Sequence, residues 1–221
     1  EEAYLSLYKH ISKEWVDRDV FNHMWTIFYN DMKLRSILYD LGFGSYLVDA
    51  YAHTNDAFIS NMAYKVTEAK LQDTELLYNL IDESKEYYRS APIFLNRDQY
   101  LKEDIEAIIE KNKIFIAWDA HHAIGFIHVG ISQRYNIFDL SIKNCGLIDE
   151  IGAYIKPEYR GKGLGKDLLK NVFDYCINNG ICAIHVDFET ANLFANKFWK
   201  KYFKPMLLST RRTINKNINE L

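Results

Sequence analysis

The sequence predicts a mixed α/β (α+β) fold with a smaller α/β segment at its N-terminal end. The chain has 221 residues, which is enough for one large domain or two small ones with a buried core. From about residue 64 onward, segments with the period of strands alternate with segments with the period of helices. A glycine-rich loop at residues 160–165 lies between a predicted strand and a predicted helix.

The larger segment opens with a strand, two helices and a hairpin. Residues 63–69 alternate weakly between apolar and polar side chains, which predicts a strand. Asp73 or Thr74 can cap a helix, and a second helix is expected near residues 98–111. Residues 113–131 are rich in β-formers on both sides of a short polar turn, which predicts a hairpin.

Strands and helices then alternate around the glycine-rich loop. Residues 147–155 predict a strand, which Pro157 ends. After the loop, apolar side chains recur at i, i+4 and i+8 from Leu168, and Gly180 ends the helix that they predict. The remaining expected elements are a strand at 181–188, a helix at 192–202 and a last strand at 206–213.

The first fifty residues have the element order of the last stretch of the chain. They predict a helix at 4–16, a strand at 21–29, a helix at 32–41 and a strand at 45–50. A shift of 160 positions places Phe28 on Phe188 and Leu38-Tyr39 on Phe198-Trp199. This agreement of order and spacing predicts a duplicated half-domain, with chance similarity as the alternative. We expect the domains to span residues 1–54 and 55–221.

Composition excludes several classes of protein. The net charge is -3 and the chain has no Lys/Arg-rich run, which argues against a nucleic-acid partner. No apolar run is long enough to cross a bilayer, and no signal-peptide pattern opens the chain. The three cysteines are widely spaced without metal-ligand spacing, which predicts reduced thiols, no metal site and a cytoplasmic location.

The loop at residues 160–165 is the most informative stretch. Three of the ten glycines lie here, at Gly161, Gly163 and Gly165. Glycine adopts positive φ readily and lets a ligand approach the backbone closely. The first N–H groups of a helix have no internal partner and lie at the positive end of its dipole. A strand, such a loop and a helix therefore predict a pyrophosphate site, with a glycine-rich turn that binds nothing as the alternative.

Spacing excludes two other phosphate-binding motifs. A Walker A loop needs glycine where Arg160 stands and Ser or Thr where Asp167 stands. A dinucleotide-binding fingerprint needs glycine where Lys166 stands.

The pattern Arg160-x-x-Gly163-x-Gly165 resembles the acetyl-CoA signature of the GNAT superfamily of N-acetyltransferases, Gln/Arg-x-x-Gly-x-Gly/Ala. Ile155-x-Pro157-x-Tyr159 before it and Asn192-x-x-Ala195-x-x-Phe198-Trp199 after it are also similar to that family. The resemblance covers residues 64–221 in element order. The tail from Val186 to Arg212 resembles tandem GNAT-like proteins of unassigned substrate, so residues 1–54 would be a degenerate GNAT-like half-domain.

This resemblance implies a GNAT fold, in which a mixed central sheet opens as a splay between its two middle strands and is flanked by helices. The thioester of acetyl-CoA would lie in the splay, its pyrophosphate on the loop amides, and its pantetheine arm along residues 153–155. Lys162 and Lys166 could add positive charge beside the loop. The residues implied in binding acetyl-CoA are Ala153, Tyr154, Ile155, Arg160, Gly161, Lys162, Gly163, Leu164, Gly165, Lys166, Asn192 and Trp199.

Acyl transfer to an amine needs a base, because an ammonium must lose a proton before it attacks. Asp149 and Glu150 interrupt the otherwise apolar strand 147–155, and alternation places them on opposite faces. Asp149 lies eleven residues before Arg160, where some histone-acetylating GNAT members carry a base glutamate. Glu189 is a competitor. These carboxylates could instead bind a cationic amine or cap loops, and a base could act through ordered water.

The proton donor for the leaving thiolate departs from the family pattern. Trp199 stands where the family usually has tyrosine, and an indole N–H is a poor proton donor. Tyr202, one helical turn later, is the candidate acid, with a core aromatic as the alternative. A thiolate can also leave without a dedicated acid.

The sequence therefore predicts an enzyme that transfers an acetyl group from acetyl-CoA to a primary amine of a small-molecule or peptide acceptor. The alternative from another class is a regulatory module that binds acetyl-CoA without turnover, which the Trp199 substitution favours. A third is that the N-terminal segment serves as a platform for a protein partner. A homodimer is left open.

Overall fold

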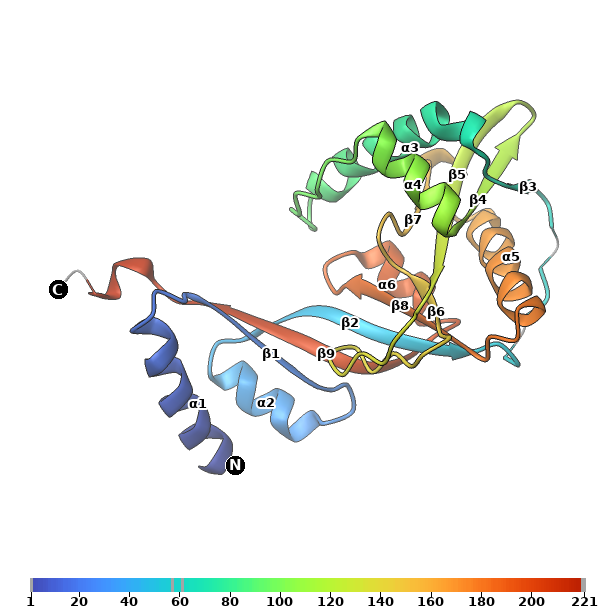
Figure 1. The fold of residues 1–221 in the computed structure, drawn as a ribbon. Helices are drawn as coiled ribbons and strands as arrows, with labels where there is room; N and C mark the ends of the chain where they lie inside the picture. The colour runs from blue at the N-terminus through green and yellow to red at the C-terminus, as the bar shows by residue number, and fades with distance from the viewer. Residues whose placement is uncertain (1, 57, 61, 220–221) are drawn as a thin grey trace. The chain divides into compact units, whose positions relative to one another are not determined.

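The structure is a computed structural model that describes residues 2–56, 58–60 and 62–219 (Figure 1). The chain forms two compact units, one from residues 51–187 and the other from residues 1–50 with residues 188–221. Strands β2 (Gly44–His53) and β8 (Ala183–Glu189) each pass from one unit into the other. The helices of the described residues include none that is long and apolar enough to span a membrane.

The unit of residues 51–187 is built on a mixed sheet. Its strands follow the order β8-β6-β5-β4-β3, and β7 pairs with β5 beside β6. The pairing of β6 with β8 is parallel, whereas β3 with β4 and β4 with β5 are antiparallel. The mixed sheet and the central hairpin are as predicted. The strands are β3 (Lys65–Glu68), β4 (Lys113–Asp119), β5 (His122–Ile131), β6 (Gly146–Ile148) and β7 (Ala153–Ile155).

Helices flank this sheet, because its central strands bury side chains on both faces. Ile114 and Ile116 of β4 belong to the core that α3 (Thr74–Arg89) and α4 (Lys102–Lys111) cover. Phe115, which alternates with them, packs its ring on Tyr175 of α5 (Leu164–Asn178), at 6.4 Å between centroids. Since side chains alternate between the faces of a strand, α5 covers the face opposite α3 and α4 (Figure 1).

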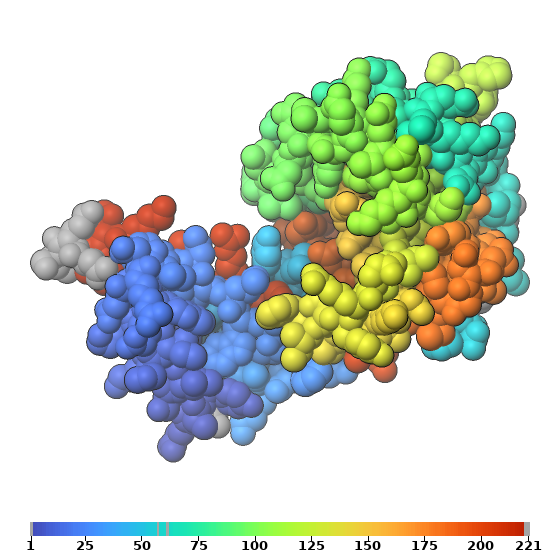
Figure 2. Space-filling view, viewed as in Figure 1, coloured from blue at the N-terminus to red at the C-terminus, as the bar shows by residue number. Residues whose placement is uncertain are grey.

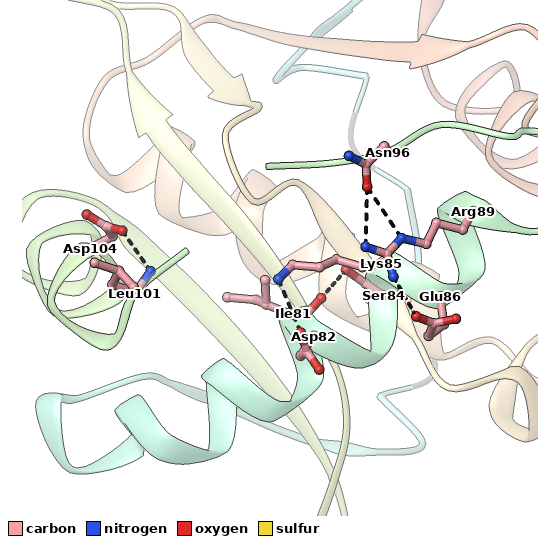
Figure 3. Close-up of polar contacts among 9 residues, drawn as sticks. All are labelled: Ile81, Asp82, Ser84, Lys85, Glu86, Arg89, Asn96, Leu101 and Asp104. Atoms are coloured by element: carbon pink, nitrogen blue, oxygen red, sulfur yellow. Dashed lines mark hydrogen bonds and ion pairs between the residues drawn. The ribbon is translucent and has the colours of Figure 1, made fainter. Parts of the chain in front are cut away.

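Local polar contacts set the starts of α3 and α4, and Figure 3 shows the one at α4. The predicted cap residue Asp73 instead accepts from the Lys70 amide at 2.8 Å, which closes a 3₁₀ turn, Leu71–Asp73, before α3. The Leu101 amide donates to Asp104 Oδ2 at 2.7 Å, so α4 begins at Lys102 rather than near residue 98. Lys85 of α3 is 7% exposed and pairs with Asp82 at 3.1 Å.

The prediction of one strand over residues 147–155 is wrong. The chain forms the short strands β6 and β7 with a turn between them. The turn is closed by the Gly152 amide, which donates to the Asp149 carbonyl at 2.6 Å, and Glu150 within it has φ of 55°. A residue with positive φ cannot continue a strand, so the alternation expected for Asp149 and Glu150 does not apply.

The unit of residues 1–50 and 188–221 has its own strand order, β1-β9-β2. Strand β1 pairs antiparallel with β9 along its whole length, from Asn22 opposite Thr213 to Phe28 opposite Leu207. Its elements are α1 (Glu2–Val16), β1 (Asn22–Phe28), α2 (Met32–Asp40), α6 (Leu193–Trp199), β9 (Lys204–Thr213) and a 3₁₀ turn (Lys216–Asn219), with parts of β2 and β8.

The order helix, strand, helix, strand occurs twice along the chain, as α1-β1-α2-β2 and as α5-β8-α6-β9. The caps of the second helices also agree. Asp31 accepts from the Leu34 amide before α2, and Asn192 accepts from the Ala195 amide before α6. This recurrence supports the predicted duplication, which stays a prediction together with the domain limits 1–54 and 55–221.

Candidate functional site

Strand β7 leaves one of its edges without a neighbouring strand among the described residues. The opposite edge pairs with β5. The amide of Lys156 donates to Ile124 and the amide of His128 donates to Gly152, which marks the hydrogen-bonded pairs of this antiparallel ladder. By alternation, the main-chain groups of Tyr154 face β5, and those of Ala153 and Ile155 face the open edge.

The open edge of β7 begins where the sheet divides. Strand β6 pairs with β8 through residues 146–148 and 184–186, whereas β7 pairs with β5 alone. The turn at residues 149–152 therefore lies at a fork in the sheet, where the chain passes from β6, which pairs with β8, to β7, which pairs with β5 alone. This fork is the splay that the fold class predicted.

The glycine-rich loop continues from β7 through a 3₁₀ turn, Pro157–Tyr159. Gly161 has φ of 75° and Gly163 has φ of 92°, and a Cβ added at either would meet nothing within 4 Å. Glycine is needed at both positions because of the backbone conformation rather than because of crowding. The space in front of these residues is open to a ligand.

The amides at the start of α5 have no side-chain cap. Gly163 is the N-cap residue in a left-handed conformation and makes no capping hydrogen bond. The first amides that bond back into the helix are those of Lys166 and Asp167, which both donate to the Gly163 carbonyl. Within the part of the chain that the structure describes, the amides of residues 161–165 have no acceptor. Such a row of amides at a helix N-terminus fits an anionic group of phosphate type.

The side chain of Arg160 belongs to the support of the loop. Its Nε donates to the Ile155 carbonyl at 2.9 Å, and its guanidinium lies 4.1 Å from the centroid of the Tyr87 ring. The arginine of the motif thus ties the loop to the end of β7 and to α3. Lys162 and Lys166 lie on the aromatic rings of Tyr159 and Phe58, at 5.5 and 6.0 Å.

Further contacts fix the residues just before and just after the glycine-rich loop. Tyr159 donates its hydroxyl to Asp119 at the end of β4, at 2.8 Å. Asp167, 2% exposed, accepts from the Ser60 hydroxyl and from the Tyr64 amide, the latter at 3.2 Å. This acid therefore fastens Ser60 and Tyr64 to α5 and leaves the first amides of its own helix uncapped.

The turn at residues 149–152 brings both predicted carboxylates to one histidine. His128 of β5 is 0% exposed; its Nε2 lies 3.4 Å from Glu150 Oε2 and its Nδ1 lies 3.8 Å from Asp149 Oδ1. Asp149 and Glu150 are partly exposed, with 44% and 42% of their side-chain surface open. Burial and the charge of Glu150 raise the pKa of Asp149.

His128 was missed by the sequence reasoning. The signal was the imidazole of His128 among the apolar residues 123–131, next to the predicted strand that carries the two carboxylates. Ligand atoms of His128, Asp149 and Glu150 come within 4.8 Å of one another, which is close enough for a metal ion. Because burial lowers the pKa of His128 to about 4, its ring is neutral at pH 7 and its contacts with the carboxylates are not ion pairs.

We expect His128→Asn to reduce the pH dependence of folding stability. In the unfolded chain the imidazole binds a proton below its usual pKa of 6.5, whereas the folded ring stays neutral down to about pH 4. The unfolded state binds more protons in this window, so stability is complete above pH 6.5 and falls by up to about 3 kcal/mol towards pH 4. Urea denaturation of both proteins at pH 7 and pH 4.5 measures the difference, and equal losses in the two would contradict the assignment.

The other predicted site residues lie in the unit of residues 1–50 and 188–221. Asn192 is buried and caps α6, and Trp199 packs its ring on Phe203 at 5.4 Å. Tyr202 packs on Phe198 at 5.1 Å, and burial raises the pKa of its phenol, which keeps it protonated. Glu189 ends β8. Their parts in binding or catalysis stay predictions.

The comparisons with known proteins agree with this fold. An N-acetyltransferase from Bacillus subtilis, the uncharacterized YhfO, is 26% identical over 137 residues, which are 62% of this chain and 86% of that protein. A GNAT acetyltransferase structure from Colwellia psychrerythraea matches with a TM-score of 0.62 at 14% identity, over 89% of this chain and 66% of its own. PaiA N-acetyltransferase from Thermoplasma acidophilum, solved with coenzyme A, matches with a TM-score of 0.54 at 21% identity, over 67% and 98%.

The model of the acetyltransferase (GNAT) family matches residues 74–203, which is more than half of the chain. This range includes β7, the glycine-rich loop, α5 and the turn with its two carboxylates. The chain belongs to the GNAT family of N-acetyltransferases.

Proposed function

We propose that this chain transfers the acetyl group of acetyl-CoA to a primary amine of a small-molecule or peptide acceptor. The observation that carries the proposal is the open edge of β7 together with the uncapped amides of residues 161–165. The amides fit the pyrophosphate, and Ala153 and Ile155 fit the pantetheine arm, which carries amides of its own.

Around the pyrophosphate, this proposal separates residues that bind through the backbone from residues that support them. Gly161, Lys162, Gly163, Leu164 and Gly165 act through their backbone amides. Arg160 and Tyr154 act as supports, because Arg160 bonds to Ile155 and the main chain of Tyr154 faces β5. The pyrophosphate charge is met by amide dipoles and by the two lysines beside the loop.

The carboxylates at the fork support a cationic acceptor. Asp149 and Glu150 lie where the sheet divides, which is where the thioester of a cofactor laid along β7 would end. A carboxylate there can attract an ammonium and accept its proton, and the free amine can then attack the thioester carbon. A backbone N–H near the start of β7 is the candidate donor to the oxyanion.

A second candidate function is the binding of acetyl-CoA without turnover. The observation that favours it is Trp199, which is buried at the position where the family usually has tyrosine. Enzyme and binding module share the cofactor site and differ only in whether an acceptor is acetylated.

One pair of measurements separates these functions. We expect calorimetry to show binding of acetyl-CoA, with the affinity falling as salt screens the pyrophosphate. We then expect thiol release from acetyl-CoA in the presence of at least one of four amines: kanamycin, spermidine, lysine and a short peptide with a free amino terminus. Binding without thiol release for any amine supports the binding module, and absence of binding contradicts both.

A further inference from the structure

The two ring nitrogens of His128 differ in their hydrogen bonding to the described residues. Its Nδ1 lies 3.1 Å from the Asp149 carbonyl oxygen. Its Nε2 is buried and makes no hydrogen bond to any residue that the structure describes. Glu150 Oε2 lies 3.4 Å from this nitrogen.

The partners of the ring determine where its proton lies. A carbonyl oxygen can only accept, so the contact with Asp149 requires a proton on Nδ1. Since the buried ring is neutral at pH 7, Nε2 then carries a lone pair. A lone pair and an ionised carboxylate both accept hydrogen bonds, so the approach of Nε2 to Glu150 is satisfied only when a proton lies between them.

We propose that Glu150 takes the proton of the acceptor ammonium and that His128 is the positioning residue that stabilises the protonated Glu150 by accepting its hydrogen bond at Nε2. This inference rests on the proposed acetyl transfer and identifies which group at the fork handles the proton. Glu150 is open to solvent on one side and meets the buried nitrogen on the other.

The proton balance of the reaction is then complete. An N–H bond of the ammonium breaks, its electron pair stays on nitrogen, and the proton joins Glu150 Oε2 and donates to His128 Nε2. The amine nitrogen bonds to the thioester carbon, and the C–S bond breaks with its pair on sulfur. The nitrogen loses a second proton, the thiolate takes up one, and Glu150 returns its proton to solvent. The sum is ammonium plus acetyl-CoA giving amide, free thiol and one proton.

The neighbours of Glu150 hold it in this orientation. Asn112 donates from Nδ2 to Glu150 Oε2 at 3.1 Å, and Arg97 donates to the Glu150 carbonyl at 2.6 Å. The charges near the pair are those of Arg97, of Lys111, which disfavours a proton on His128, and of Asp149. His185 lowers the pKa of Asp149, and Asp139 raises it.

The geometry favours a proton over a metal ion at this cluster. The two carboxylates approach different nitrogens of the ring, Asp149 at Nδ1 and Glu150 at Nε2. Nδ1 is occupied by the Asp149 carbonyl, so a metal ion could bind only Nε2. One ion at Nε2 would have Glu150 beside it, whereas Asp149 approaches Nδ1.

The first test reads the ring itself and does not need an acceptor. Long-range ¹H–¹⁵N spectra of the full chain labelled at histidine, with His128 assigned from its loss in His128→Asn, should show a neutral ring protonated at Nδ1 from pH 5 to pH 8. Glu150→Gln should shift the Nε2 resonance. A proton on Nε2, a charged ring at pH 7, or no response to Glu150→Gln would overturn the proposal, even if acetyl transfer is observed.

The second test uses whichever of the four amines is acetylated. Glu150→Gln should lower kcat by about 10²- to 10⁴-fold with unchanged affinity for acetyl-CoA. His128→Asn keeps a donor for the Asp149 carbonyl and removes Nε2, so kcat should fall about 10-fold and the acid limb of its pH profile should move to lower pH. His122→Asn, on the same strand and exposed, is the matched control and should behave as wild type.

The outcomes separate the alternatives. A fall in kcat for His128→Asn without movement of the acid limb indicates a structural role and overturns the proposal. Loss of activity with a chelator and recovery with zinc shows a metal site and also overturns it. If no amine reacts but the spectra show the expected ring and its coupling to Glu150, the proposed function fails while the arrangement of the pair stands.

Discussion

Gly163→Ala is expected to weaken acetyl-CoA binding about 100-fold or more. Gly163 has φ of 92°, a conformation that costs an L-residue about 1–2 kcal/mol. Alanine would relieve this strain by rotating the peptide units on both sides, which turns the amides of Gly163 and Leu164 away from a shared anion. Each hydrogen bond from an amide to a charged group is worth about 1.5–3 kcal/mol, so losing two gives at least this factor. Calorimetric titration with acetyl-CoA measures the effect.

Gly180→Ala is the matched control for this variant. Gly180 follows the other end of α5, has φ of 68°, and also has nothing within 4 Å of an added Cβ. Both variants should therefore lose about the same free energy of unfolding, about 1–2 kcal/mol, and only Gly163→Ala should lose affinity. Equal affinities in the two would show that the amides before α5 do not hold the cofactor.

The loop and its helix could be predicted from sequence because their signals are local. Gly161 and Gly163 require positive φ, and the apolar period from Leu168 defines the buried face of α5. The sequence signature does not show which contacts the side chain at a matching position makes. Arg160 fits the family signature, yet its Nε is bonded to the Ile155 carbonyl, and that depends on where β7 ends.

The turn at residues 149–152 could not be predicted in the same way. Residues 147–155 have the composition of one strand, and the residue with φ of 55° is Glu150 rather than a glycine. What stabilises the turn is a long-range contact, the bond of His128 to the Asp149 carbonyl, together with Arg97 on the carbonyl of Glu150. Contacts of this kind appear only once β5 lies beside the turn, so sequence periodicity contains no sign of them.

Gly125→Ala is expected to lower the free energy of unfolding by about 2–3 kcal/mol and to weaken acetyl-CoA binding at least about 10-fold. An added Cβ at Gly125 would lie 2.6 Å from the Tyr154 carbonyl oxygen and 3.2 Å from Ile155 Cα. Both atoms belong to the backbone, so the contact can be relieved only by moving β7 away from β5. The open edge of Ala153 and Ile155 moves with it, and the pantetheine arm loses its partner.

Gly130→Ala, five positions later on the same strand, shows whether the effect comes from β7 or from any alanine in β5. Its added Cβ would lie 3.3 Å from Asn112 Oδ1, the end of a side chain that can give way. This variant should change stability by less than about 1 kcal/mol, because crowding is relieved by a rotamer and the unfolded chain loses entropy. Urea denaturation of both variants measures the change in stability, and calorimetric titration with acetyl-CoA measures the change in affinity. If Gly125→Ala bound as tightly as Gly130→Ala despite its lower stability, the cofactor would not depend on the edge of β7, and the pyrophosphate loop alone would account for binding.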